Sequence, residues 1–237
     1  MTIVVAVVAF LGIVIAAAIA SRFYAIAQRY RRAQYVRDYV WPPGLLDKLA
    51  KRHASFTRKE TALVSQGLRQ FFLAYLNSGN RYVAMPSQVA DDLWHEFILY
   101  TRAYEGFCRA AFGEFLHHTP AVALAPGRKQ DNSGLRRVWW FCCKDESIDP
   151  RRPSRLPLLF ALDTKLKIPG GYRYAPDCGD LRRDGSAGTQ CGGDFSDPSV
   201  DGGTDGFGSD TGVSDGGSDA GSNDGGGCGG GCSGGSD

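Results

Sequence analysis

Side chains that bind metals or transfer protons are concentrated between positions 91 and 118. Three of the four histidines lie in this stretch. Its candidate residues are Asp91, Asp92, Trp94, His95, Tyr104, Cys108, His117 and His118. Imidazole and thiolate groups are metal ligands, and a carboxylate beside a histidine can fix the tautomer of its ring. The stretch therefore holds the best candidates for a metal site.

The spacing of these residues narrows the candidate ligands. Asp91 and His95 are four residues apart, so on a helix they share one face. His117 or His118 can fold back beside them beyond the end of that helix. Asp91, His95, His117 and His118 therefore predict a divalent metal site, with zinc as the example. The alternative is a structural polar cluster that closes a helix corner without an ion.

Cys108 does not fit the same site. In one unbroken helix, Cys108 and His95 lie about 20 Å apart along the axis and point about 140° apart. The two side chains can share a metal only if the helix breaks between Leu99 and Ala103. We expect Cys108 to be a buried thiol at the edge of the apolar stripe. A Cys108–His nucleophilic pair is supported by spacing alone.

Capping and breaking residues delimit the helices that carry these side chains. Thr57 and Glu60 are spaced as a capping box, and residues 77–80 end the helix that the box begins. Residues 86–87 open the next helix, and an apolar stripe at steps of three and four extends it to Gly113. Residues 135–146 and 155–166 predict two more helices. No strand or hairpin pattern competes, so the predicted domain is all-α.

The N-terminal segment Ile3 to Ala20 has no charged or strongly polar side chain. Its 18 residues would span about 27 Å as a helix, against a hydrocarbon core of about 30 Å. We predict a single membrane-spanning helix. Five arginines follow it within the next 20 residues, at Arg22, Arg29, Arg31, Arg32 and Arg37. The positive-inside rule then places the N-terminus outside the cell (inner) membrane and the remaining chain in the cytoplasm.

A cleaved signal peptide is the alternative to the anchor. Residues 18–20, Ala-Ile-Ala, have the form of a cleavage site, but a signal peptide carries a basic n-region and a shorter apolar core. In the cytoplasm the seven cysteines should be thiols.

Charge divides the chain after Arg183. All 27 Lys and Arg residues lie at or before it, whereas ten of the 25 acidic residues follow it. The basic, aromatic stretch beyond the anchor predicts contact with anionic lipid headgroups, and its position disfavours nucleic acid as the partner. The glycine and aspartate of the C-terminal part predict disorder. The predicted organisation is an anchor (1–21), a basic juxtamembrane helix (22–41), a helical domain (42–178) and a disordered tail (179–237).

The order Asp91-Asp92-Leu93-Trp94-His95, Tyr104, Cys108, Gly113 and His117-His118 resembles the glycine-rich domain-containing protein-like family, described in plants and with bacterial members. The resemblance covers about residues 45–180, and the glycine-cysteine run at 225–232 is similar to the tails of bacterial relatives. The family often has a second histidine two residues after the first, where this chain has Phe97, so one potential ligand is missing. The resemblance implies no settled chemistry, although plant members are linked to RNA association.

These observations predict a single-pass membrane protein whose helical domain is a non-enzymatic interaction module that docks a protein partner. The alternative is a metal-dependent enzyme or metal sensor that uses Asp91, His95 and His117 or His118. A weaker alternative is RNA binding through the basic juxtamembrane stretch.

Overall fold

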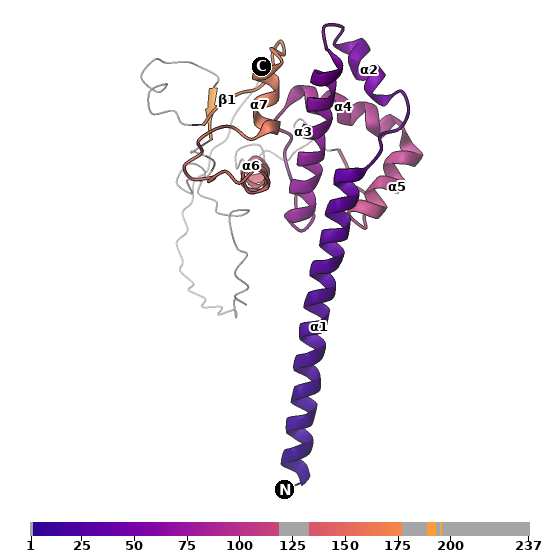
Figure 1. Cartoon of the computed structure of the whole chain (residues 1–237), viewed down its shortest axis with the longest axis vertical. Coiled ribbons are helices and arrows are strands. Elements are labelled where there is room, and N and C mark those ends of the chain that lie inside the picture. The colour runs from indigo at the N-terminus through magenta and orange to yellow at the C-terminus, as the bar shows by residue number, and fades with distance from the viewer. Residues whose placement is uncertain (1, 119–132, 177–188, 193–194, 196–237) are drawn as a thin grey trace, which may run out of the picture. The chain divides into compact units, whose positions relative to one another are not determined.

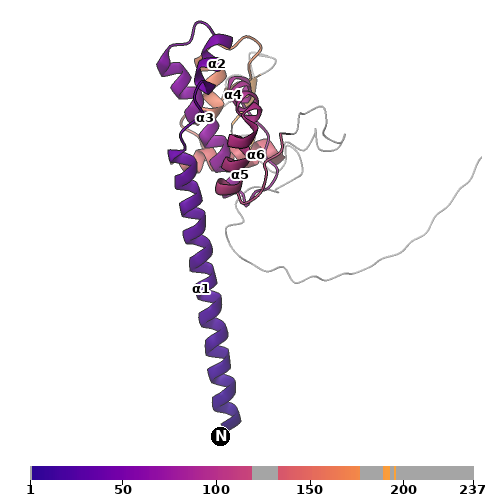
Figure 2. The ribbon, with the colours of Figure 1, turned by 90° about the vertical axis from the view of Figure 1, so that its right-hand side faces the viewer.

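One long helix, α1 (Thr2–Asp38), projects from a group of shorter helices (Figures 1 and 2). The computed structural model describes residues 2–118, 133–176, 189–192 and 195. Within these residues α1 is the one helix long and apolar enough to cross a membrane, and its span from Phe10 to Asp38 passes that test. The predicted anchor and juxtamembrane segments therefore form one continuous helix, which ends at Asp38 and not at residue 41 as predicted.

The rest of the described chain is mostly helical, as predicted. The further helices are α2 (Leu45–Arg52), α3 (Arg58–Asn77), α4 (Gln88–Leu99), α5 (Thr101–Ala111), α6 (Ser133–Asp145) and α7 (Leu158–Lys165). The all-α prediction needs one correction, because β1 (Arg173–Ala175) and β2 (Thr189–Cys191) pair as parallel strands. Strands of three residues are too short to show the alternation by which a strand is recognised in a sequence.

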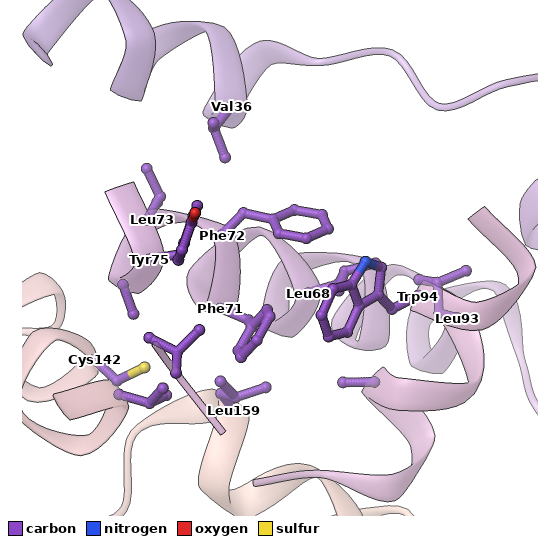
Figure 3. Packing of buried hydrophobic residues seen from close by; sticks show 14 of the residues in the cluster. Val36, Leu68, Phe71, Phe72, Leu73, Tyr75, Leu93, Trp94, Cys142 and Leu159 are labelled. Carbon is purple, nitrogen blue, oxygen red and sulfur yellow. The ribbon is translucent and has the colours of Figure 1, made fainter. Parts of the chain in front are cut away.

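Helix α3 is the centre of the domain and contacts α1, α2, α4, α6 and α7. Its buried residues lie on nearly every side, as expected for a core helix rather than a surface one. Phe71 and Phe72 extend from it in different directions, toward α7 and α1 (Figure 3). Gly67 lets α7 approach closely, because a Cβ at this position would lie 2.4 Å from Leu162 Cδ1.

The capping signals were correct. The Thr57 hydroxyl accepts a hydrogen bond from the Glu60 N–H, and the Glu60 carboxylate accepts one from the Thr57 N–H. Two orphan donors at the start of α3 are thereby satisfied. Ser87 caps α4 by accepting from the Ala90 N–H. The helices predicted over 135–146 and 155–166 correspond to α6 and α7.

The helix predicted to run unbroken from residue 88 to Gly113 is instead two helices. It breaks at Tyr100, the residue between α4 and α5. The break brings the Trp94 indole N–H to 3.1 Å from the Tyr104 hydroxyl. In an unbroken helix these two residues would be about 15 Å apart along the axis. Neither glycine nor proline marks the break, which is why the sequence pattern did not reveal it.

The helical domain extends beyond residue 178, the boundary predicted from the sequence. Phe195, which falls in the predicted tail, is buried against Trp139, Phe160 and Tyr174. A single aromatic residue among glycines and aspartates gives no helix or strand pattern, so the sequence did not place it in the core. Apart from residues 189–192 and 195, the tail predicted to be disordered (179–237) lies outside the described residues.

The buried carboxylate of Asp163 on α7 holds the start of α4. It accepts hydrogen bonds from the Ser87 hydroxyl at 2.8 Å and from the Gln88 and Val89 N–H groups at 2.8 and 3.2 Å. A fourth bond comes from the Tyr172 N–H at 2.9 Å. A carboxylate at this position also complements the positive end of the α4 dipole. Asp163 thus ties α4 and the segment before β1 to α7.

Replacing Asp163 with asparagine should destabilise the domain by about 2–4 kcal/mol, because charge-assisted bonds weaken and the new amide N–H₂ faces backbone donors. Urea unfolding of the full chain in detergent measures the change. Asp47→Asn, at an exposed position in α2, is the matched control and should shift stability by no more than about 0.5 kcal/mol. Equal stability of the two variants would contradict the role given to Asp163.

Candidate metal centre

Helix α4 presents Asp91 and His95 on the face opposite its core residues. Leu93 and Trp94 are buried, whereas the Asp91 and His95 side chains are 31% and 49% exposed. One ring nitrogen of His95, Nδ1, lies 2.9 Å from the Asp91 carbonyl oxygen and 3.4 Å from Asp91 Oδ2. A hydrogen bond from Nδ1 to the carbonyl would leave Nε2 free to bind an ion. The predicted pairing of Asp91 and His95 on one face is present.

A buried hydrogen-bond relay brings the segment after α5 to this face. The Tyr104 hydroxyl donates to the Leu116 carbonyl oxygen at 2.5 Å and accepts from the Trp94 indole N–H. Burial and the neighbouring Cys108 raise the pKa of Tyr104, so this hydroxyl keeps its proton. The turn between α5 and the segment is made at Gly113, whose φ of +81° favours glycine.

These hydrogen bonds place His118, and not His117, beside Asp91 and His95. Its Nε2 lies 3.0 Å from Asp91 Oδ1, and its ring centroid lies 4.2 Å from that of His95. The Trp94 indole packs against the same ring, edge to face, with centroids 4.6 Å apart. His118 is therefore oriented by a carboxylate on one side and by an aromatic ring on the other.

Asp91, His95 and His118 form a three-residue group with the composition of a metal site. Their potential ligand atoms all lie within 4.8 Å of one another. Tetrahedral zinc with bonds of about 2.1 Å places ligand atoms roughly 3.4 Å apart. The three side chains therefore need only small rotations to reach tetrahedral coordination geometry. Figure 3 shows Trp94 extending from α4 toward the α3 core, the buried side of this site.

The other predicted site residues lie elsewhere. His117 is exposed and packs against Phe115, with ring centroids 4.7 Å apart. Asp92 points toward α2, where it contacts His53 Nε2 at 3.1 Å and Arg52 Nη1 at 2.8 Å. Cys108 is fully buried, and burial raises the pKa of its thiol. A buried protonated thiol is a poor nucleophile, so the geometry does not favour a cysteine–histidine pair.

Asp91, His95 and His118 line a pocket of about 520 Å³. Its walls come from the C-terminal end of α3, residues 80–85, α4 and residues 114–118. Glu114 contributes a second carboxylate to the lining and accepts a hydrogen bond from the Tyr75 hydroxyl at 3.0 Å. Sequence reasoning missed both residues. The acid directly after the helix-ending Gly113 was the available signal, since the turn brings it back toward α3.

The predicted anchor residues all belong to α1. Ala20, Arg22, Arg29 and Arg31 are exposed, and the side chain of Ile3 lies outside those described. Arg32 differs because its Nη1 donates to the Phe112 carbonyl oxygen at 3.0 Å. This bond fastens α1 to the end of α5.

Cysteine pairing departs from the prediction of seven thiols. Cys108, Cys142 and Cys143 are free and buried, whereas Cys191 is disulfide-bonded. No pairing signal marks Cys191 in the sequence, because pairing partners cannot be deduced from spacing alone.

Tyr104→Phe should destabilise the domain by about 2–4 kcal/mol, because the buried Trp94 N–H and Leu116 carbonyl each lose their partner. It should also loosen His118, seen as loss of the nuclear Overhauser contact between the His95 and His118 rings. Tyr100→Phe is the matched control. It also removes a tyrosine hydroxyl, but this one donates to the Pro43 carbonyl oxygen at 3.3 Å in an exposed position. A Tyr104→Phe protein that keeps the ring contact would refute the positioning role.

The chain matches a known family over most of its length. The family model described as UCP032817-like covers residues 31–195. No curated protein and no solved structure matches the chain. The match to this model, and not the resemblance to the glycine-rich family, is what assigns the family. The matched residues include the C-terminal end of α1, the Asp91–His95–His118 cluster and the buried Phe195. The chain therefore belongs to the UCP032817-like family.

Proposed function

We propose that this protein is anchored in a membrane by α1 and that its helical domain binds a divalent metal ion of the zinc class through Asp91, His95 and His118. The observation that carries the proposal is the approach of three ligand-type side chains to within 4.8 Å at the wall of a pocket. A purely structural cluster of this kind needs no adjoining cavity.

The ligand set favours an open site over a closed structural one. Structural zinc is held by four protein ligands, most often with cysteine, whereas catalytic zinc keeps three protein ligands and an exchangeable position. Two imidazoles and one carboxylate correspond to the second type. The pocket supplies room for a water molecule or substrate beside the ion, and a metal ion lowers the pKa of bound water. We therefore favour a metal-dependent enzyme over a non-enzymatic interaction module.

The membrane assignment rests on α1. Its length and apolar surface support a single-pass anchor, and the arginines that follow support a cytoplasmic domain. The disulfide at Cys191 is the opposing observation, since disulfides are typical of oxidising compartments. We retain the cytoplasmic orientation because the arginine flank lies directly beside the span. We also propose that the chain is a member of the glycine-rich domain-containing protein-like family. We propose in addition that its C-terminal tail is disordered.

The full chain purified in detergent and dialysed against zinc should hold about one ion per molecule by elemental mass spectrometry. His95→Ala should weaken zinc binding by more than about 100-fold, the upper range for loss of a mere outer-shell partner. His117→Ala is the matched control, because His117 lines the same pocket but lies outside the cluster. It should keep the ion.

Thermal unfolding distinguishes metal loss from misfolding. Zinc should raise the unfolding temperature of wild type and of His117→Ala, and leave that of His95→Ala unchanged. If wild type binds no ion and His95→Ala changes stability alone, the domain is the interaction module predicted from the sequence. That outcome would remove the metal proposal.

A reporter enzyme fused after Asp237 tests orientation. We expect activity from a reporter that works in the cytoplasm and none from one that needs export. Changing Arg22, Arg29, Arg31 and Arg32 together to glutamine should reduce this bias, because positive charge beside the span sets it. An active exported reporter on the unaltered chain would reverse the topology and agree with the disulfide at Cys191.

A further inference from the structure

The bare length of α1 fixes where the domain meets the bilayer. Every described side chain from Phe10 to Arg31 is exposed, and Arg32 is the first to be partly covered. From Ile3 to Arg31 an α-helix is about 43 Å long, which covers a hydrocarbon core of about 30 Å and the headgroup layer beyond it, about 5–7 Å thick. The helical domain therefore begins where α1 would leave the headgroup layer (Figures 1 and 2). This argument rests on the membrane anchorage proposed above.

Apolar exposure on α1 continues past the first arginine. Phe23, Tyr24 and Ile26 are 66–69% exposed, although they follow Arg22. With a hydrocarbon core of about 30 Å beginning at Ile3, the core ends after about 20 residues, near Arg22. Aromatic side chains just beyond this level suit the interface between acyl chains and headgroups. The next residues of α1 then lie at the level of the lipid phosphates.

A groove of about 330 Å³ lies at this level, between α1 and α5. One wall is a single face of α1, and the other is Ala110 of α5. The α1 residues that line it are Tyr24, Ala27, Gln28, Arg31, Arg32 and Tyr35. The described lining contains two guanidinium groups and no carboxylate. Helical side chains lean toward the N-terminus of their helix, which here is the direction of the bilayer.

The two arginines of the groove have different roles. Arg32 is fixed by its hydrogen bond to the Phe112 carbonyl oxygen. Arg31 is exposed and has no hydrogen bond or ion pair with another described residue. A guanidinium without a protein partner, beside one that is held in place, is suited to a phosphate oxygen, for which the arginine fork is well matched.

We propose that this groove, formed by Tyr24, Gln28, Arg31 and Arg32 of α1 against Ala110 of α5, is a binding site for the phosphate of an anionic phospholipid. The ligand chemistry is a phosphodiester that carries one negative charge. We assign the phosphodiester to a lipid and not to RNA or free phosphate, because the face of α1 that lines the groove continues directly from the bilayer. Bound lipid seats the underside of the domain on the headgroup layer.

Titration of the full chain in detergent with a fluorescent phosphatidylglycerol tests the site. Arg31→Gln should weaken binding about fivefold, since one cation beside an anionic leaflet contributes about 1 kcal/mol. Arg102→Gln is the matched control, because Arg102 is an exposed arginine of α5 outside the groove. It should bind as wild type does. Equal weakening of both variants, or of neither, would overturn the proposal.

Competition identifies the source of the phosphate. Inorganic phosphate and a single-stranded RNA, each at the concentration of the lipid, should leave the bound phosphatidylglycerol in place. Displacement by either one that depends on Arg31 would overturn the lipid assignment.

Alkaline carbonate extraction of membranes separates this proposal from the anchorage beneath it. Wild type and Arg31→Gln should both stay in the membrane pellet. Release of wild type would defeat the anchorage, and the lipid site with it. Retention of both proteins with identical lipid affinities would defeat the groove alone.

Discussion

The Asp163 carboxylate accepts four hydrogen bonds inside the domain, two from the first residues of α4 and one from the Ser87 N-cap of that helix. A buried carboxylate without partners would cost several kcal/mol, so its donors are obligatory. Because Gln88 and Val89 are fixed in this way, Asp91 follows less than one turn later at a set height and angle, and His95 one turn beyond. The position of the candidate ligands on α4 thus depends on a residue of α7.

Trp94 connects the core to the candidate site. Its indole packs against Phe71 with ring centroids 5.0 Å apart, and on the other side against His118. Its N–H bonds Tyr104, which in turn bonds the Leu116 carbonyl. One side chain therefore fills the core, orients a histidine ring and holds the relay that places the 115–118 segment.

Features that depend only on residues close together in the sequence were predictable from it. The Thr57 and Glu60 capping box and the pairing of Asp91 with His95 need only residues three or four apart. Three features depended on contacts distant in sequence and were not predictable: the break at Tyr100, the burial of Phe195, and the choice of His118 over its neighbour. Adjacent histidines in an extended segment point to opposite sides. Which of the two faces Asp91 is decided by the Tyr104–Leu116 hydrogen bond.

Helix α1 and the pocket are connected through the Phe112 carbonyl oxygen. The Phe112 carbonyl oxygen accepts hydrogen bonds from Arg32 of α1 and from Asn80, a residue of the pocket wall. The next residues are Gly113 and Glu114, of which Glu114 also lines the pocket. At the C-terminal end of α1, Arg69 of α3 donates to the carbonyl oxygens of Val36 and of Tyr39, the residue that follows the helix. Helix α1 reaches these contacts without a break. If α1 is the membrane anchor proposed above, the pocket has a fixed height above the bilayer. A substrate attached to the membrane would reach the pocket at this height, whereas a soluble one would gain nothing from the constraint.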